Sequence, residues 1–170
     1  NSRKVTADPT LFFVGKELRN FARFTPNMGE YFFNQMDFTF DTEGNVIWFG
    51  FYSRSKYYYQ GGFFFIKINA SRTKVLVKKR HDFSQELLRD IFDRKRVKPN
   101  KEVRSYKKVQ WRLTEDGGLV MTAEEQPHGT TSFKSHGVIV TRFDKEGEIV
   151  WTRHIYKHGR QPERLKVFLS

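Results

Sequence analysis

The 170-residue sequence contains no cysteine. This absence excludes a disulfide framework, a thiol nucleophile, and zinc or iron–sulfur sites built from cysteine, so histidine and carboxylates are the only strong metal ligands left. The sequence also lacks a signal-peptide pattern and any apolar run near the roughly 20 residues that span a bilayer. We therefore expect no transmembrane segment. Because the first residue is Asn1 and not methionine, we interpret the chain as a processed mature protein or a portion of a longer one.

Acidic residues are scarce, since 19 Asp and Glu stand against 31 Lys and Arg, and the formal net charge is +12. Such an excess favours contact with polyanions. Much of it lies in residues 94–108, the basic connector, where Glu102 is the single acidic residue. The basic residues of this segment are Arg94, Lys95, Arg96, Lys98, Lys101, Arg104, Lys107 and Lys108. We predict that the connector binds an anionic polymer or a partner protein, and a solvated loop is the alternative interpretation.

Aromatic residues are abundant, at 16% of the chain, and an apolar fraction of 38% is enough for a folded core. Two stretches, 36–79 and 109–154, align with each other as similar units. Each is typical of four short strands rich in β-branched and aromatic residues, joined by turns of Asp, Asn and Gly. The sequence therefore predicts a mainly β fold of antiparallel four-stranded meanders.

The turns within the two units share one chemistry. Gly44, Gly117 and Gly147 follow acidic or polar turn residues, which is typical of a type I turn whose glycine adopts a positive φ. In the corresponding turn at 69–73, Arg72 stands where glycine is expected. The acidic residues resemble calcium ligands, but these loops are too short for a calcium site, so hairpin turns are the preferred interpretation.

One short helix is expected between the two units. Apolar residues between Leu87 and Phe92 form a single stripe at helical spacing, Ser84 is a suitable N-cap, and Pro99 should end the helix by about residue 97. The expected organisation is an N-terminal segment with a strand at 11–14 (1–35), a first β repeat (36–83), the helix and basic connector (84–108), a second β repeat (109–161) and a C-terminal tail (162–170).

The hairpins at 116–120 and 137–151 resemble those of bacterial β-propeller blades. More closely, the chain resembles an uncharacterised family of secreted, envelope-associated proteins from Bacteroidetes-type bacteria, over roughly residues 36–161. The motifs that carry this resemblance are Phe49-Gly50-Phe51-Tyr52, 61–68, 116–119 with Glu124-Glu125-Gln126, 137–144 and 155–161. The resemblance implies a blade-like repeat in a secreted, periplasmic or envelope-associated protein. It implies no activity, and the family's members are longer than this chain.

No catalytic centre, metal site or other cofactor site is predicted. Glu124 and Glu125 are adjacent and should point to opposite faces of a strand, which argues against a glycosidase pair made of these two. The sequence lacks a phosphate-binding loop and the nucleophile elbow of serine hydrolases. His128 and His136 flank one loop, but their spacing matches no zinc pattern.

The aromatic cluster Tyr57, Tyr58 and Tyr59 could stack on bases or sugars, or pack within a sheet or loop. The neighbouring Gly61-Gly62 pair is interpreted as backbone freedom at a turn. Our leading hypothesis is a non-enzymatic scaffold or binding module of the bacterial envelope, which contacts an anionic polymer or a protein within a larger assembly. A nucleic-acid-binding β domain and a carbohydrate-acting enzyme on a propeller scaffold are the alternatives.

Two four-stranded units are too few to close a propeller ring. We therefore expect unpaired sheet edges, with the apolar strands 63–68 and 138–143 as examples, that need a cover. The N-terminal segment, further repeats, a second copy of the chain or a partner protein could supply it.

Overall fold

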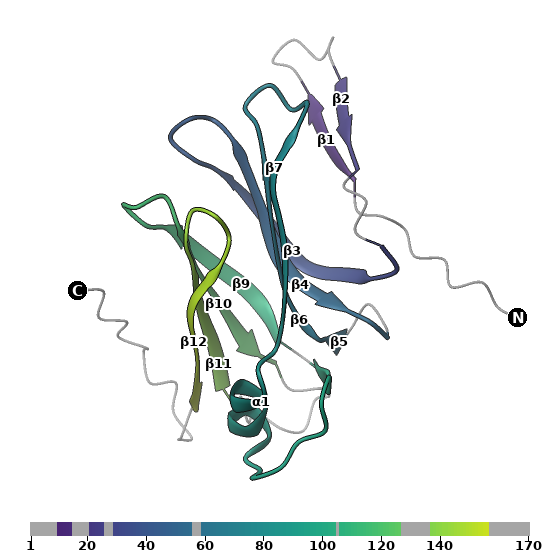
Figure 1. Cartoon of the computed structure of the whole chain (residues 1–170), viewed down its shortest axis with the longest axis vertical. Coiled ribbons are helices and arrows are strands. Elements are labelled where there is room, and N and C mark those ends of the chain that lie inside the picture. Colours follow the sequence, from purple (N-terminus) through teal and green to yellow (C-terminus); the bar gives the residue numbers. More distant parts are fainter. Residues whose placement is uncertain are drawn as a thin grey trace, which may run out of the picture.

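Two four-stranded antiparallel sheets form the body of the protein (Figure 1). The computed structural model describes residues 10–14, 21–25, 29–55, 59–104, 106–126 and 137–156. The first sheet contains β3 (Phe32–Phe40), β4 (Val46–Ser53), β6 (Gly62–Ile68) and β7 (Val75–Asp82), and the second contains β9 (Tyr106–Leu113), β10 (Leu119–Glu125), β11 (Gly137–Phe143) and β12 (Ile149–Tyr156). The predicted mainly β fold of antiparallel four-stranded meanders is confirmed, and the described strands form no closed barrel.

Three smaller elements accompany the sheets. They are the hairpin of β1 (Leu11–Val14) and β2 (Phe21–Phe24), the two-stranded pair of β5 (Tyr59–Gln60) and β8 (Val103–Arg104), and helix α1 (Gln85–Phe92). The predicted N-cap is confirmed, because the Ser84 Oγ accepts a hydrogen bond from the Leu87 backbone N–H at 3.1 Å. The helix ends at Asp93, which adopts the left-handed conformation. No helix in the described segments is long and apolar enough to cross a membrane.

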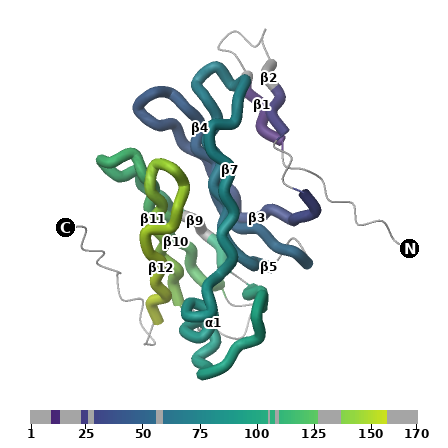
Figure 2. The backbone as a smooth tube through the Cα atoms, in the orientation of Figure 1, coloured from purple at the N-terminus to yellow at the C-terminus, as the bar shows by residue number. Residues whose placement is uncertain are grey.

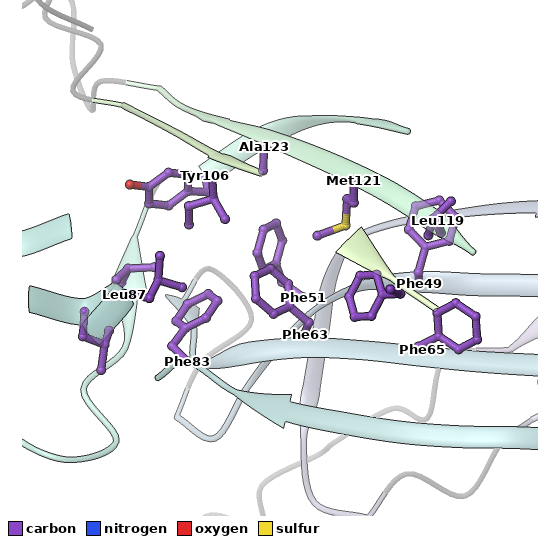
Figure 3. Packing of buried hydrophobic residues seen from close by; sticks show 14 of the residues in the cluster. Phe49, Phe51, Phe63, Phe65, Phe83, Leu87, Tyr106, Leu119, Met121 and Ala123 are labelled. Carbon is purple, nitrogen blue, oxygen red and sulfur yellow. The ribbon is translucent and has the colours of Figure 1, made fainter. Parts of the chain in front are cut away.

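The main core lies between the two sheets (Figure 3). Alternate residues of β4 and β6, among them Phe49 and Phe65, point toward the second sheet and meet residues such as Met121 and Phe143. Helix α1 adds Leu87 and Leu88 to this core at the end where β7 finishes (Figure 2). Aromatic residues of both sheets thus contribute to the contact between them.

A second apolar cluster lies on the opposite face of the first sheet. It contains Trp48 and Phe64, and the β1–β2 hairpin packs against it through Leu11, Phe13 and Phe24. Because both faces of β4 are covered, every residue of this strand is buried, which explains its continuous apolar run. The hairpin thus covers a sheet face, and neither of its two strands pairs with an edge of the four-stranded sheets.

The sheet edges differ from the expectation. Strands β6 and β11, which correspond to the apolar segments 63–68 and 138–143, each pair with a strand on both sides, so the prediction that they are edges is wrong. In a meander the third strand is always flanked, and the edges are β3, β7, β9 and β12. Polar contacts tie these edges together across the two sheets. The Trp111 Nε1 donates to Asp37 at 2.8 Å, and a ring nitrogen of His81 lies 2.7 Å from the Gly147 carbonyl oxygen.

The predicted turn chemistry is confirmed. Gly44, Gly117 and Gly147 have φ values of 77°, 80° and 76°. Arg72 adopts the same conformation with φ of 63°, although it carries a side chain. Its Nη1 donates to the Gly44 carbonyl oxygen at 2.9 Å, and its guanidinium lies over the Phe13 ring at 5.2 Å. These contacts offset the cost of left-handed backbone at a non-glycine residue.

Candidate anion-binding surface

The basic connector begins directly after helix α1 and leads to β8 and β9 (Figure 1). Arg94, Lys95, Arg96 and Lys98 are all exposed. Within the described part of the chain, none of these four side chains forms an ion pair or a hydrogen bond. The connector therefore presents four exposed positive charges over five positions.

Glu102, the single acidic residue of the connector, is bonded to the segment that follows β4. The Glu102 carboxylate accepts hydrogen bonds from the Arg54 backbone N–H at 2.6 Å and from the Ser55 hydroxyl. Next to it, β8 pairs with β5, and Val103 is buried. Glu102 thus fastens the connector to the end of the first sheet.

A polar network lies beside this anchor. The Arg54 Nη2 lies 2.5 Å from the Asp82 Oδ2, and the Tyr52 hydroxyl donates to the Asp82 Oδ1. Burial and the carboxylate of Asp82 raise the pKa of Tyr52, so the phenol stays protonated. Burial alone would raise the pKa of Asp82, but hydrogen bonds from Tyr52 and Arg54 hold it below its ordinary value. At neutral pH the network is a fixed set of paired groups.

Gly61 and Gly62 pack against this network. A Cβ atom on Gly62 would lie 2.1 Å from the His81 carbonyl oxygen and 2.7 Å from the Tyr52 ring, and one on Gly61 would lie 2.9 Å from the Glu102 Oε1. Neither glycine is among the described residues with positive φ. The interpretation of this pair as backbone freedom at a turn is therefore wrong, because the glycines are required for close approach.

Cations near the connector rest on aromatic rings. The Arg80 guanidinium carbon lies 4.0 Å from the Tyr31 ring centroid, and that of Arg104 lies 4.3 Å from the Tyr59 centroid. The Lys101 Nζ lies 4.1 Å from the centroid of the Phe92 ring. Such contacts hold a positive charge in place at a small energetic gain.

The structure places some of the predicted site residues and leaves others undescribed. Lys107 is exposed on β9, whereas the side chain of Lys108 is outside the described part. Tyr59 pairs with Arg104 across β5 and β8, and Tyr57 and Tyr58 are outside the described residues.

Sequence reasoning missed Arg80, Tyr31 and the anchoring role of Glu102. The only available signal was the alternation along β7, which leaves Arg80 at an exposed position of a half-buried strand. Its position beside Tyr31 depends on packing between distant segments, which no local pattern reports.

The histidines and carboxylates elsewhere are arranged as parts of the fold. The Tyr106 hydroxyl lies 3.1 Å from the His154 Nε2, and burial lowers the pKa of His154. Glu124 and Glu125 occupy successive positions of β10. His128 and His136 are outside the described residues.

Among the described residues, no group of three or more His, Cys, Asp or Glu side chains could hold a metal ion. The exposed cations of the connector can act on a ligand through screened attraction and through hydrogen bonds donated to oxyanions. No protein-family model, curated protein or solved structure matches this chain.

Proposed function

We propose that the protein is a non-enzymatic binding module of the bacterial cell envelope and that it holds an anionic polymer through the basic connector. The observation that carries this proposal is the separation of charge within the connector. Arg94, Lys95, Arg96 and Lys98 are exposed and have no side-chain partner among the described residues, while the connector's own carboxylate, that of Glu102, accepts a hydrogen bond from the Arg54 backbone N–H. The envelope location is supported by the resemblance of residues 36–161 to an envelope-associated family.

A polymer suits this surface better than a small anion. The charge of an exposed site is screened over about 8 Å at physiological ionic strength, so a single small anion gains little from it. A polymer brings several charges to neighbouring cations and releases its counterions, and its affinity then depends steeply on salt. The pairing of β8 with β5 and the Glu102 anchor keep the connector positioned for such multiple contact.

The test compares two variants of equal net charge. In the first, Arg94, Lys95, Arg96 and Lys98 are changed to Gln. In the control, four exposed basic residues from other parts of the molecule are changed to Gln, namely Lys74, Arg112, Lys145 and Arg153. Retention on heparin and its dependence on salt concentration are measured, and circular dichroism checks that both variants fold.

We expect the connector variant to elute at much lower salt and to show a flatter salt dependence, because each lost ionic contact reduces the slope by roughly one. The control should elute close to the unmodified protein. Equal losses in both variants would show that net charge alone causes binding, and the proposal would then be wrong.

A further inference from the structure

We infer that Arg80, held on Tyr31 beside the connector, forms a discrete site for one carboxylate or sulfate group of an acidic polysaccharide. This inference rests on the proposed function, because it names the class of polymer and one individual contact. The site lies on β7 and on the residue that precedes β3, and none of the predicted site residues belongs to it.

The Arg80 side chain is positioned before any ligand arrives. Its guanidinium carbon lies 4.0 Å from the centroid of Tyr31 and 5.4 Å from that of Tyr52. The Tyr31 ring is itself held edge-on against Tyr52, with centroids 5.3 Å apart and an interplanar angle of 87°. Because Tyr52 is fully buried, the platform is fixed to the sheet. An arginine held in this way has less rotamer freedom to lose on binding.

The hydrogen-bonding groups of Arg80 are available. The residue is exposed, and its guanidinium donates no hydrogen bond to a described residue. The Asp82 carboxylate, two residues further along β7, already accepts from Tyr52 and pairs with Arg54. A guanidinium presents a planar fork of N–H groups that matches two oxygens of one oxyanion.

The local charge fits a singly charged group. Asp82 is paired with Arg54 at 2.5 Å, and Glu102 accepts a hydrogen bond from the Arg54 backbone N–H. The Arg80 guanidinium has no ion-pair partner among the described residues, and one carboxylate or sulfate ester would balance its charge.

The site is continuous with the connector. Arg54 lies over the Tyr52 ring at 5.6 Å, and its backbone N–H binds Glu102 of the connector. Arg80 contacts the same Tyr52 ring. In Figure 1 the connector passes from α1 to β8 at the end of the molecule where β7 finishes, so one extended polymer can reach both places.

The aromatic rings favour a polysaccharide over a nucleic acid. Sequence-tolerant binding of single-stranded nucleic acid depends on aromatic faces that are free to stack with bases. Here Tyr31, Tyr59 and Phe92 each hold a cation of the protein on one face. The rings therefore serve as supports for cations, and recognition takes place through the oxyanions of the ligand.

The test uses the whole chain and three variants. Arg80→Lys keeps the charge and removes the planar fork, Tyr31→Leu removes the support and keeps every charge, and Arg112→Lys is the matched control at an exposed strand position. Dissociation constants are measured by isothermal titration calorimetry with oligoguluronate as the carboxylate ligand, dextran sulfate as the sulfate ligand and poly(U) RNA as the nucleic acid. Thermal unfolding confirms that each variant is folded.

We expect Arg80→Lys and Tyr31→Leu to weaken binding of at least one polysaccharide by about tenfold, as loss of a charge-assisted bidentate contact would. The carboxylate and sulfate arms identify which group the site takes. Unchanged polysaccharide affinity in Arg80→Lys would overturn this inference, while the connector variant would still report on the proposed function separately. Tighter binding of poly(U) with the same dependence on Arg80 would also overturn it, in favour of a nucleic acid.

Discussion

Gly147 is the turn glycine at which one added methyl group should damage the fold most. Gly44, Gly117 and Gly147 share nearly the same positive φ. A Cβ atom on Gly44 or Gly117 would find its nearest neighbour at 3.7 Å or 3.6 Å, which is ordinary contact. On Gly147 it would lie 2.4 Å from Cδ1 of Phe65, a buried residue of the other sheet. Alanine at Gly44 or Gly117 therefore tests the cost of the backbone conformation alone, whereas alanine at Gly147 adds the cost of overpacking the core.

The expected magnitudes follow from these two costs. Left-handed backbone at a non-glycine residue costs roughly 1–2 kcal/mol. Gly44→Ala and Gly117→Ala should each lower the free energy of unfolding by about that amount. Overpacking of a filled core adds about 1–3 kcal/mol, so Gly147→Ala should lower the free energy of unfolding by about 2–5 kcal/mol. The free energy of unfolding is measured by urea titration, with the slope of the transition checked for constancy.

A double-mutant cycle tests the physical cause at Gly147. Phe65→Leu removes the ring that the new methyl group would contact. The loss of unfolding free energy caused by Phe65→Leu should therefore be smaller in the Gly147→Ala variant than in the unmodified protein. The corresponding cycle of Phe65→Leu with Gly117→Ala should show no coupling. The reasoning is refuted if the three alanine variants unfold at the same urea concentration, or if the Gly147 cycle is additive.

Three further predictions concern pH and helix capping. Burial opposes ionisation of Asp41, but hydrogen bonds from Lys67 and Asn45 lower its pKa, so stability is lost as pH falls below about 4; urea midpoints between pH 2 and 5 should depend less on pH in Asp41→Asn. Burial lowers the pKa of His154, so the unfolded chain binds a proton more readily below about pH 6.5 and stability falls toward acid; thermal unfolding from pH 7 to 5 should lose this component in His154→Gln. Ser84→Ala should cost about 1 kcal/mol in urea unfolding and Ser84→Gly only a few tenths, since glycine is tolerated at the N-cap.

Local chemistry was the part of the fold that the sequence predicted best. The positive φ of Gly44 and the cap at Ser84 each depend on residues within one turn of the chain, so the neighbouring residues in the sequence are enough to predict them. Arg72 shows the limit of this reasoning. Its side chain donates to the Asn69 and Ala70 carbonyl oxygens within the turn, but it also contacts Phe13 and the Gly44 carbonyl oxygen, which are remote in sequence and which no local rule identifies.

The candidate surface was predictable in its charge and not in its geometry. The sequence identified the connector directly, because its basic residues are clustered within residues 94–108. The hydrogen bonds of Glu102 required knowledge that Arg54 and Ser55 lie beside it. The pairing of Arg80 with Tyr31 likewise needed the assembled first sheet, because it joins β7 to the segment before β3.

The β1–β2 hairpin gives the molecule a part that can open without unfolding. Its strands are hydrogen-bonded to each other and to no other described strand, and Leu11, Phe13 and Phe24 attach it to the first sheet through side chains. Lifting it breaks no backbone hydrogen bond of that sheet, so amide protons of the hairpin should exchange through a small local transition, whereas those of β4 require the sheet to come apart. Trp48 is only 3% exposed and belongs to the cluster against which the hairpin packs, so a dissolved quencher should reach it at the rate of this local opening.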